Sequence, residues 1–156
     1  MDPSYAQIEG REFDWFAIDS RGEVGHFSAA GFGPVPVVLL QQLHRIEGVP
    51  TAVQRLPTRG AAAAHAPGVI SDWLAMAERG CHSFDWEHWS GPYRRVATPS
   101  NPLQWRDLPV QLADLLRLIA YPTVSFAELN QIRPEWLCDC AQAPQAIRVN
   151  PVQFLQ

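Results

Sequence analysis

Fourteen prolines and ten glycines are spread through the 156 residues of this chain, and they constrain its fold more than any other feature. Proline lacks a backbone N–H and ends or kinks a helix, whereas glycine adopts the positive φ angles of tight turns. The chain is therefore predicted to form several short elements joined by defined turns, not a bundle of long helices. Its length fits a single domain, residues 1–156, which needs neither a metal ion nor a disulfide for stability.

Two segments are predicted to form β-hairpins. The first pairs residues 12–19 with residues 23–31 through a turn in which Gly22 takes a positive φ. Apolar side chains fall on both faces of the first of these strands, which predicts a central position in its sheet. The second hairpin pairs residues 81–89 with residues 93–98 through a Gly-Pro turn.

Three segments have the apolar spacing of helices that pack against a sheet. Residues 51–56 are compatible with a further helical turn, and residues 123–132 with a short strand or a helical turn. Together these elements predict an α+β fold in which an antiparallel sheet built from two hairpins is covered on one side by about three helices. The predicted helices are 36–47, 69–79 and 108–119, the last capped by Asp107.

The charged residues exclude several partners and mechanisms. A net charge of −4 without a basic run argues against binding to nucleic acids or anionic membranes. All twelve basic residues are arginine, so the chain has no lysine for a Schiff base or a Walker-type phosphate loop. The start of the chain lacks the apolar core of a signal peptide, and the longest apolar run is too short to cross a membrane. We therefore expect a cytoplasmic protein with reduced thiols.

Titratable residues are densest in the segment 81–89, "CHSFDWEHW". On a strand, His82 and His88 would share one face but lie about 20 Å apart, too far to bind one metal ion. Cys81 and His82 are neighbours and would point to opposite faces, which excludes a nucleophile–base pair. We therefore expect no catalytic residue, no cofactor and no metal site.

A small hydrolase-like enzyme remains the alternative function. His26 could act as a base across the first hairpin, oriented by Asp14 or Asp19, with Ser28 as the nearest hydroxyl. No Gly-x-Ser-x-Gly motif surrounds Ser28, which argues against nucleophilic catalysis there. A second arrangement uses Asp85 with His82 or His88.

The aromatic residues give the clearest indication of function. The chain has six tryptophans, and a buried tryptophan needs a partner for its indole N–H. We expect Trp15, Trp73 and Trp86 to fill the core, whereas Trp89 lies at a strand end among charged residues. Exposed aromatic rings among charges are typical of protein-binding hot spots. The predicted partner-binding surface is the hairpin that contains Asp85, Trp86, Glu87, His88, Trp89 and Tyr93.

Three stretches carry a resemblance to known proteins: "FDWFAIDSRGEVGHFSAAGFGPVP", "FDWEHWSGPYRRVATPSNPLQWRDLP" and "YPTVSFAEL". Together they resemble a group of small, mostly uncharacterised bacterial proteins that are similar to immunity proteins of polymorphic toxin and type VI secretion systems. The resemblance covers about residues 12–130 and brings no catalytic motif. It implies a protein that binds and neutralises a delivered toxin, whose basic cleft could face Asp85 and Glu87. A structural subunit of a larger complex is a further alternative.

Overall fold

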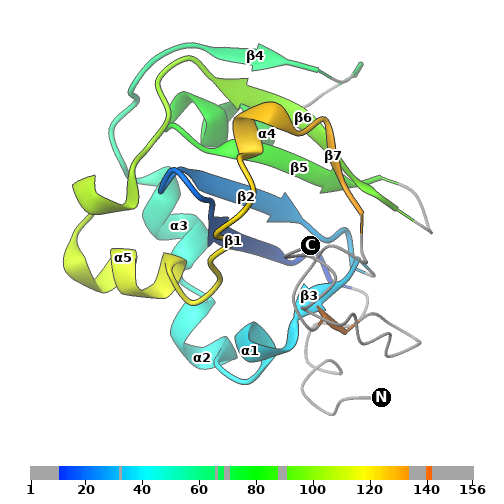
Figure 1. Ribbon diagram of the computed structural model, residues 1–156, viewed down its shortest axis with the longest axis vertical. Coiled ribbons are helices and arrows are strands. Elements are labelled where there is room, and N and C mark those ends of the chain that lie inside the picture. The colour runs from blue at the N-terminus through cyan, green and yellow to red at the C-terminus, as the bar shows by residue number, and fades with distance from the viewer. Residues whose placement is uncertain are drawn as a thin grey trace.

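The computed structural model describes residues 11–31, 33–65, 67–68, 71–87 and 91–133, and the backbone of residues 140–141. In this part of the chain the fold is α+β, as predicted (Figure 1). A two-stranded sheet joins β3 (Val35–Pro36) to β8 (Cys140–Ala141). The main sheet consists, in spatial order, of β1 (Asp14–Ile18), β2 (Val24–Ser28), β5 (His82–Trp86), β6 (Tyr93–Pro99) and β4 (Ala62–Ala64), and β7 (Gln131–Ile132) also pairs with β6.

The main sheet is mixed, which corrects the prediction of an antiparallel sheet built from two hairpins. The pairs β1–β2 and β5–β6 are antiparallel, but β2 and β5 run parallel to each other. Between these two strands the chain crosses over through its helices, and a crossover of this kind returns a strand in the parallel direction. The strand β4 lies in a segment that the sequence pattern predicts as a loop, because its three alanines have no alternation of apolar and polar residues.

The strand β1 lies at the end of the strand order, and not in the centre of the sheet as predicted. It is nevertheless buried along most of its length because both of its faces are covered. A single parallel bridge between Ile18 and Ala120 covers part of its outer edge. Burial on both faces therefore did not distinguish a central strand from a covered edge strand.

The helices are short, and more numerous than the three predicted. The predicted helix 36–47 is interrupted at Gln42, whose φ of −127° is outside the helical range. The last helix begins after Pro109, so Asp107 belongs to a preceding 3-10 turn and does not cap it. The helical elements are α1 (Val37–Leu40), α2 (Leu43–Ile46), α3 (Val49–Gln54), α4 (Ser71–Glu78), α5 (Val110–Leu116), and the 3-10 turns η2 (Trp105–Asp107) and η3 (Phe126–Glu128).

Helices and turns pack on both faces of the sheet. The helix α4 contacts β4, β5 and β6, whereas α3 and α5 contact β1. The opposite face carries an aromatic cluster in which Phe126 of η3 lies edge-on to Phe27 and Phe84. In this cluster the buried Tyr93 hydroxyl accepts a hydrogen bond from Trp15 Nε1 and donates one to the Pro34 carbonyl. The hydroxyl thus joins β1, β6 and the segment before β3.

Candidate functional site

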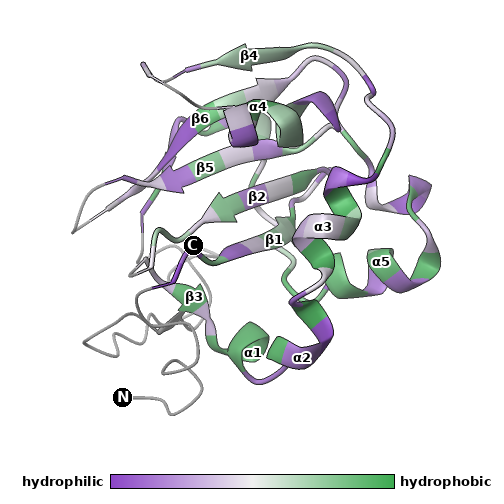
Figure 2. Cartoon of the chain, turned by 180° about the vertical axis from the view of Figure 1, so that it is seen from behind, coloured by the Kyte–Doolittle hydropathy of each residue, from purple (hydrophilic) through white to green (hydrophobic). Residues whose placement is uncertain are grey.

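One end of the main sheet carries acidic side chains on a single face. Asp14 stands opposite Ser28 in the β1–β2 register, and Ser28 stands opposite Asp85 in the β2–β5 register. The two aspartates therefore lie on the same face, two strands apart. Figure 2 shows the hydrophilic colour at the start of β1 and at the tip of β5. Arg94, which is exposed and stands opposite Asp85 on β6, is a basic residue at the same end.

The half-buried Asp85 carboxyl has an altered acidity. The pKa of this group is raised from 3.8 to about 6, chiefly by burial and also by the negative charges of Glu87 and Asp14, while His26 acts in the opposite direction. A carboxylate held among other carboxylates in a partly buried position costs free energy in the isolated protein. Groups of this kind occur at functional sites more often than elsewhere.

A cleft of about 150 Å³ lies beside Asp14, between the start of β1 and the junction of α2 with α3. The walls combine three carboxylates with apolar side chains. Glu12 and Glu47 are exposed, and the Asp14 side chain is 32% exposed. The lining residues are Glu12, Phe13, Asp14, Ile46, Glu47 and Pro50.

The buried His26 lies behind Asp14. Its Nε2 atom is 3.1 Å from Oδ2 of Asp14, which is an ion-pair distance, but the direction of the N–H group does not satisfy hydrogen-bond geometry. Its Nδ1 atom shares a hydrogen bond of 3.0 Å with Oγ of Ser83. A carboxylate, an imidazole and a hydroxyl therefore come together here, but the hydroxyl is that of Ser83 and not that of Ser28, which the sequence pattern suggested. The parallel pairing of β2 with β5 places His26 beside Ser83.

This array lacks the access that catalysis requires. Ser83 is 0% exposed, and its hydroxyl can also donate to the carbonyl oxygen of Trp73, 3.4 Å away on α4. Neither the cleft beside Asp14 nor the small apolar void near it is lined by Ser83. The hydroxyl suggested by the sequence, that of Ser28, lies at the end of β2 between Asp14 and Asp85. Asp19 does not contribute to this array.

Asp19 instead stabilises the turn of the first hairpin. Its carboxylate accepts hydrogen bonds from the backbone N–H groups of Arg21, Glu23 and Phe126. Gly22 in this turn has a φ of +79°, as predicted. This aspartate therefore has a structural role and does not orient His26.

Only some of the residues of the predicted partner-binding surface are accessible. Trp86 and Tyr93 are 1% and 0% exposed and belong to the core, where Trp86 was also expected. Asp85 is half-buried and Glu87 is exposed, so these two carboxylates are accessible. The remaining two predicted residues, His88 and Trp89, lie outside the described residues.

Other reactive residues have structural partners. His82 points to the face opposite Asp85, where its Nε2 atom forms a contact of 2.8 Å with Oε1 of the buried Glu23. Burial lowers the pKa of His82, although Glu23 acts in the opposite direction. Burial also raises the pKa of the Cys81 thiol to about 12, which makes it a poor nucleophile. Among the described residues, no group of three or more His, Cys, Asp or Glu side chains could hold a metal ion.

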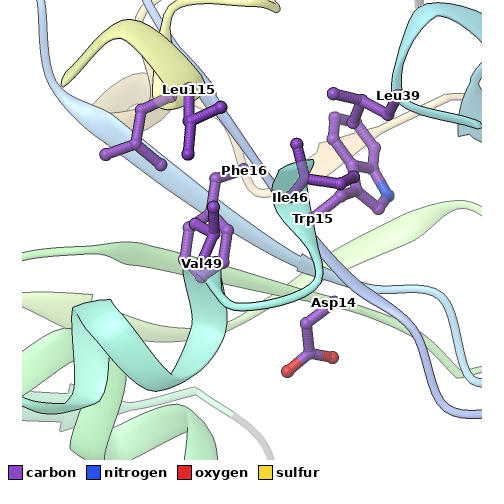
Figure 3. A pocket seen from close by; sticks show the side chains of 8 residues that line it. Asp14, Trp15, Phe16, Leu39, Ile46, Val49 and Leu115 are labelled. Carbon is purple, nitrogen blue, oxygen red and sulfur yellow. The ribbon is translucent and has the colours of Figure 1, made fainter. Parts of the chain in front are cut away.

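A void near the cleft is too small to bind a ligand. It measures about 10 Å³, which is close to the minimum for a single water molecule. Figure 3 shows that apolar side chains from β1, the α2–α3 region and α5 surround it, while the Asp14 carboxylate points away from them. The accessible chemistry at this end of the sheet is therefore that of the acidic cleft and of Asp85 with Glu87.

Comparisons with protein-family models, with curated proteins and with solved structures found no match. Within the described part of the chain, no helix is long and apolar enough to cross a membrane. The functional interpretation therefore depends on the chemistry of the site.

Proposed function

We propose that this chain is a non-catalytic binding protein of the immunity type, which neutralises a cognate bacterial toxin by covering a basic surface of that toxin. The observation that carries the proposal is the set of carboxylates at one end of the sheet. Glu12, Asp14 and Glu47 line one cleft, and the charge of Asp14 acts on Asp85 together with that of Glu87. A basic toxin surface would be attracted to this end of the molecule and would offset the repulsion among the carboxylates.

The structure supports a role in binding through its rigidity as well as its charge. The strands that present Asp85 and Asp14 are held by a buried aromatic cluster on the other face of the sheet, in which Trp15 stacks on Phe27 at 4.1 Å. Side chains on a rigid sheet lose little freedom on binding, which favours affinity.

Co-expression with a candidate toxin domain, taken from the gene that neighbours this one, tests the proposal. Cells that express the toxin domain should survive when the wild-type chain is present and should die when it carries Glu87→Arg together with Asp85→Arg. The matched control is Asp107→Arg, which reverses an exposed charge on η2, beside the β1–β2 turn at the other end of β1 from Asp14. Equal protection by the wild type and the double variant, or no protection by the wild type, would contradict the proposal.

One observation favours hydrolysis as a second candidate function. The contacts from Asp14 to His26 and from His26 to Ser83 follow the order of a serine hydrolase triad. Reaction of the native protein with a fluorophosphonate probe tests this function. We expect no labelling of Ser83, because the hydroxyl is fully buried. A probe adduct on Ser83 that is lost in Ser83→Ala would instead establish a reactive serine.

A further inference from the structure

The cleft beside Asp14 has the dimensions of one side chain. Its volume of about 150 Å³ is well below the range of about 300–1,000 Å³ that is usual for small-molecule sites. A cavity of about 150 Å³ holds a group of the size of benzene. A space of this size holds a single side chain of a partner protein.

The lining of the cleft selects a long cationic side chain. Phe13, Ile46 and Pro50 provide apolar walls for methylene groups, and the three carboxylates surround the space that a charged head group would occupy. Arginine combines a flexible apolar stem with a planar guanidinium that pairs with carboxylates in a bidentate manner and stacks on aromatic rings. It is a better match than lysine, whose ammonium group is a strongly hydrated point charge.

A buried group behind the cleft gives a second, independent indication. His26 is 2% exposed, and its Nε2 atom has no completed hydrogen bond among the described residues, although it lies 3.1 Å from Oδ2 of Asp14 in the cleft wall. Asp14 therefore contacts His26 on its buried side without a completed hydrogen bond, and its accessible side lines the cleft. A donor group that entered the cleft would form charge-assisted hydrogen bonds with the accessible side of this carboxylate.

We propose that this cleft receives one arginine side chain of the partner, with the guanidinium against Glu12, Asp14 and Glu47 and the stem against Phe13. The inference rests on the proposed function, because it names the group on the toxin that the acidic end recognises. Burial of a paired arginine in a pocket is typical of interface hot spots. The arginine would therefore contribute a large share of the affinity.

Titration of the full chain with N-acetyl-arginine amide, followed by NMR of the backbone amides, tests this inference without the toxin. We expect saturable shifts confined to residues 12–14 and 46–50. The affinity should be at least threefold weaker for N-acetyl-lysine amide and for the uncharged N-acetyl-citrulline amide. Glu12→Gln and Glu47→Gln replace exposed carboxylates and should each weaken binding at least threefold, whereas the control Asp72→Asn should not.

The inference is overturned if the shifts are absent, if either comparison probe binds equally well, or if the glutamine variants bind like the wild type. Any of these results, obtained while the wild-type chain still protects cells from the toxin, would rule out the binding of arginine in the cleft and would leave the proposed function intact. Failure of the wild-type chain to protect cells would contradict the proposed function, whatever the arginine probe does.

Discussion

Replacement of Asp85 by asparagine is predicted to stabilise the isolated protein at neutral pH. The pKa of this carboxyl is about 6 in the folded protein and 3.8 in the absence of the fold. At 1.36 kcal/mol for each pKa unit, the difference corresponds to about 3 kcal/mol. Because the carboxyl is only half-buried, solvent screening reduces the expected gain to about 1 kcal/mol.

The sign of this effect follows from the direction of the shift. A carboxyl with a raised pKa binds its proton more tightly in the folded state, so the free energy of unfolding falls as the pH rises from 3.8 through about 6. Asparagine stays neutral at every pH and avoids this loss. The advantage of the variant should therefore be complete at pH 7.5 and should fall to less than half of that value at pH 4.

Urea denaturation followed by tryptophan fluorescence at these two pH values measures the difference. Asp72→Asn, at an exposed position on α4, is the control and should give no gain. The reasoning is refuted if Asp85→Asn is less stable than the wild type at pH 7.5, or if its gain is the same at pH 4. The charge of Asp85 that lowers stability is also the one proposed to attract the toxin, so we expect the same variant to bind the toxin more weakly. A trade-off of this kind is common at functional sites.

Two further predictions concern the core. Gly91→Ala should lower the free energy of unfolding by about 2–4 kcal/mol in urea denaturation, because φ is +72° and the new Cβ would lie 2.2 Å from the Trp86 ring. Gly68→Ala, at a φ of +93° but in open space, should cost only about 1 kcal/mol, and equal losses would disprove the steric part of this argument. Tyr93→Phe should lower the free energy of unfolding by about 2 kcal/mol or more, since it leaves Trp15 Nε1 and a buried carbonyl without partners. A loss below about 0.5 kcal/mol would show that these two hydrogen bonds contribute little.

The sequence pattern predicted the elements of the fold better than their arrangement. Alternation along residues 82–86 puts Phe84 and Trp86 on one face and Ser83 and Asp85 on the other, as the structure also has them, because strand periodicity is a local property. The parallel pairing of β2 with β5 depends on the path of the chain through several helices, which no local pattern contains. That pairing is what brings His26 to Ser83.

The candidate site was predicted only in part for the same reason. Asp85 and Glu87 were identified from their position at a strand end among charged residues. Trp86 and Tyr93 were included with them because aromatic rings at a strand end are typical of both a core and a contact surface, and their burial is set by the segments that cover the sheet. The cleft was missed because its acidic lining comes from residues more than 30 positions apart, Glu12 and Asp14 on one side and Glu47 on the other.

Isothermal titration calorimetry with the candidate toxin domain from the neighbouring gene tests the central claim most directly. We expect a one-to-one complex of nanomolar affinity for the wild type. Asp85→Arg combined with Glu87→Arg should weaken it at least a hundredfold, because each new charge would face a basic surface. Urea denaturation of the double variant would verify that it is folded. A folded double variant that binds as tightly as the wild type, or a wild-type chain that does not bind the toxin, would contradict the account.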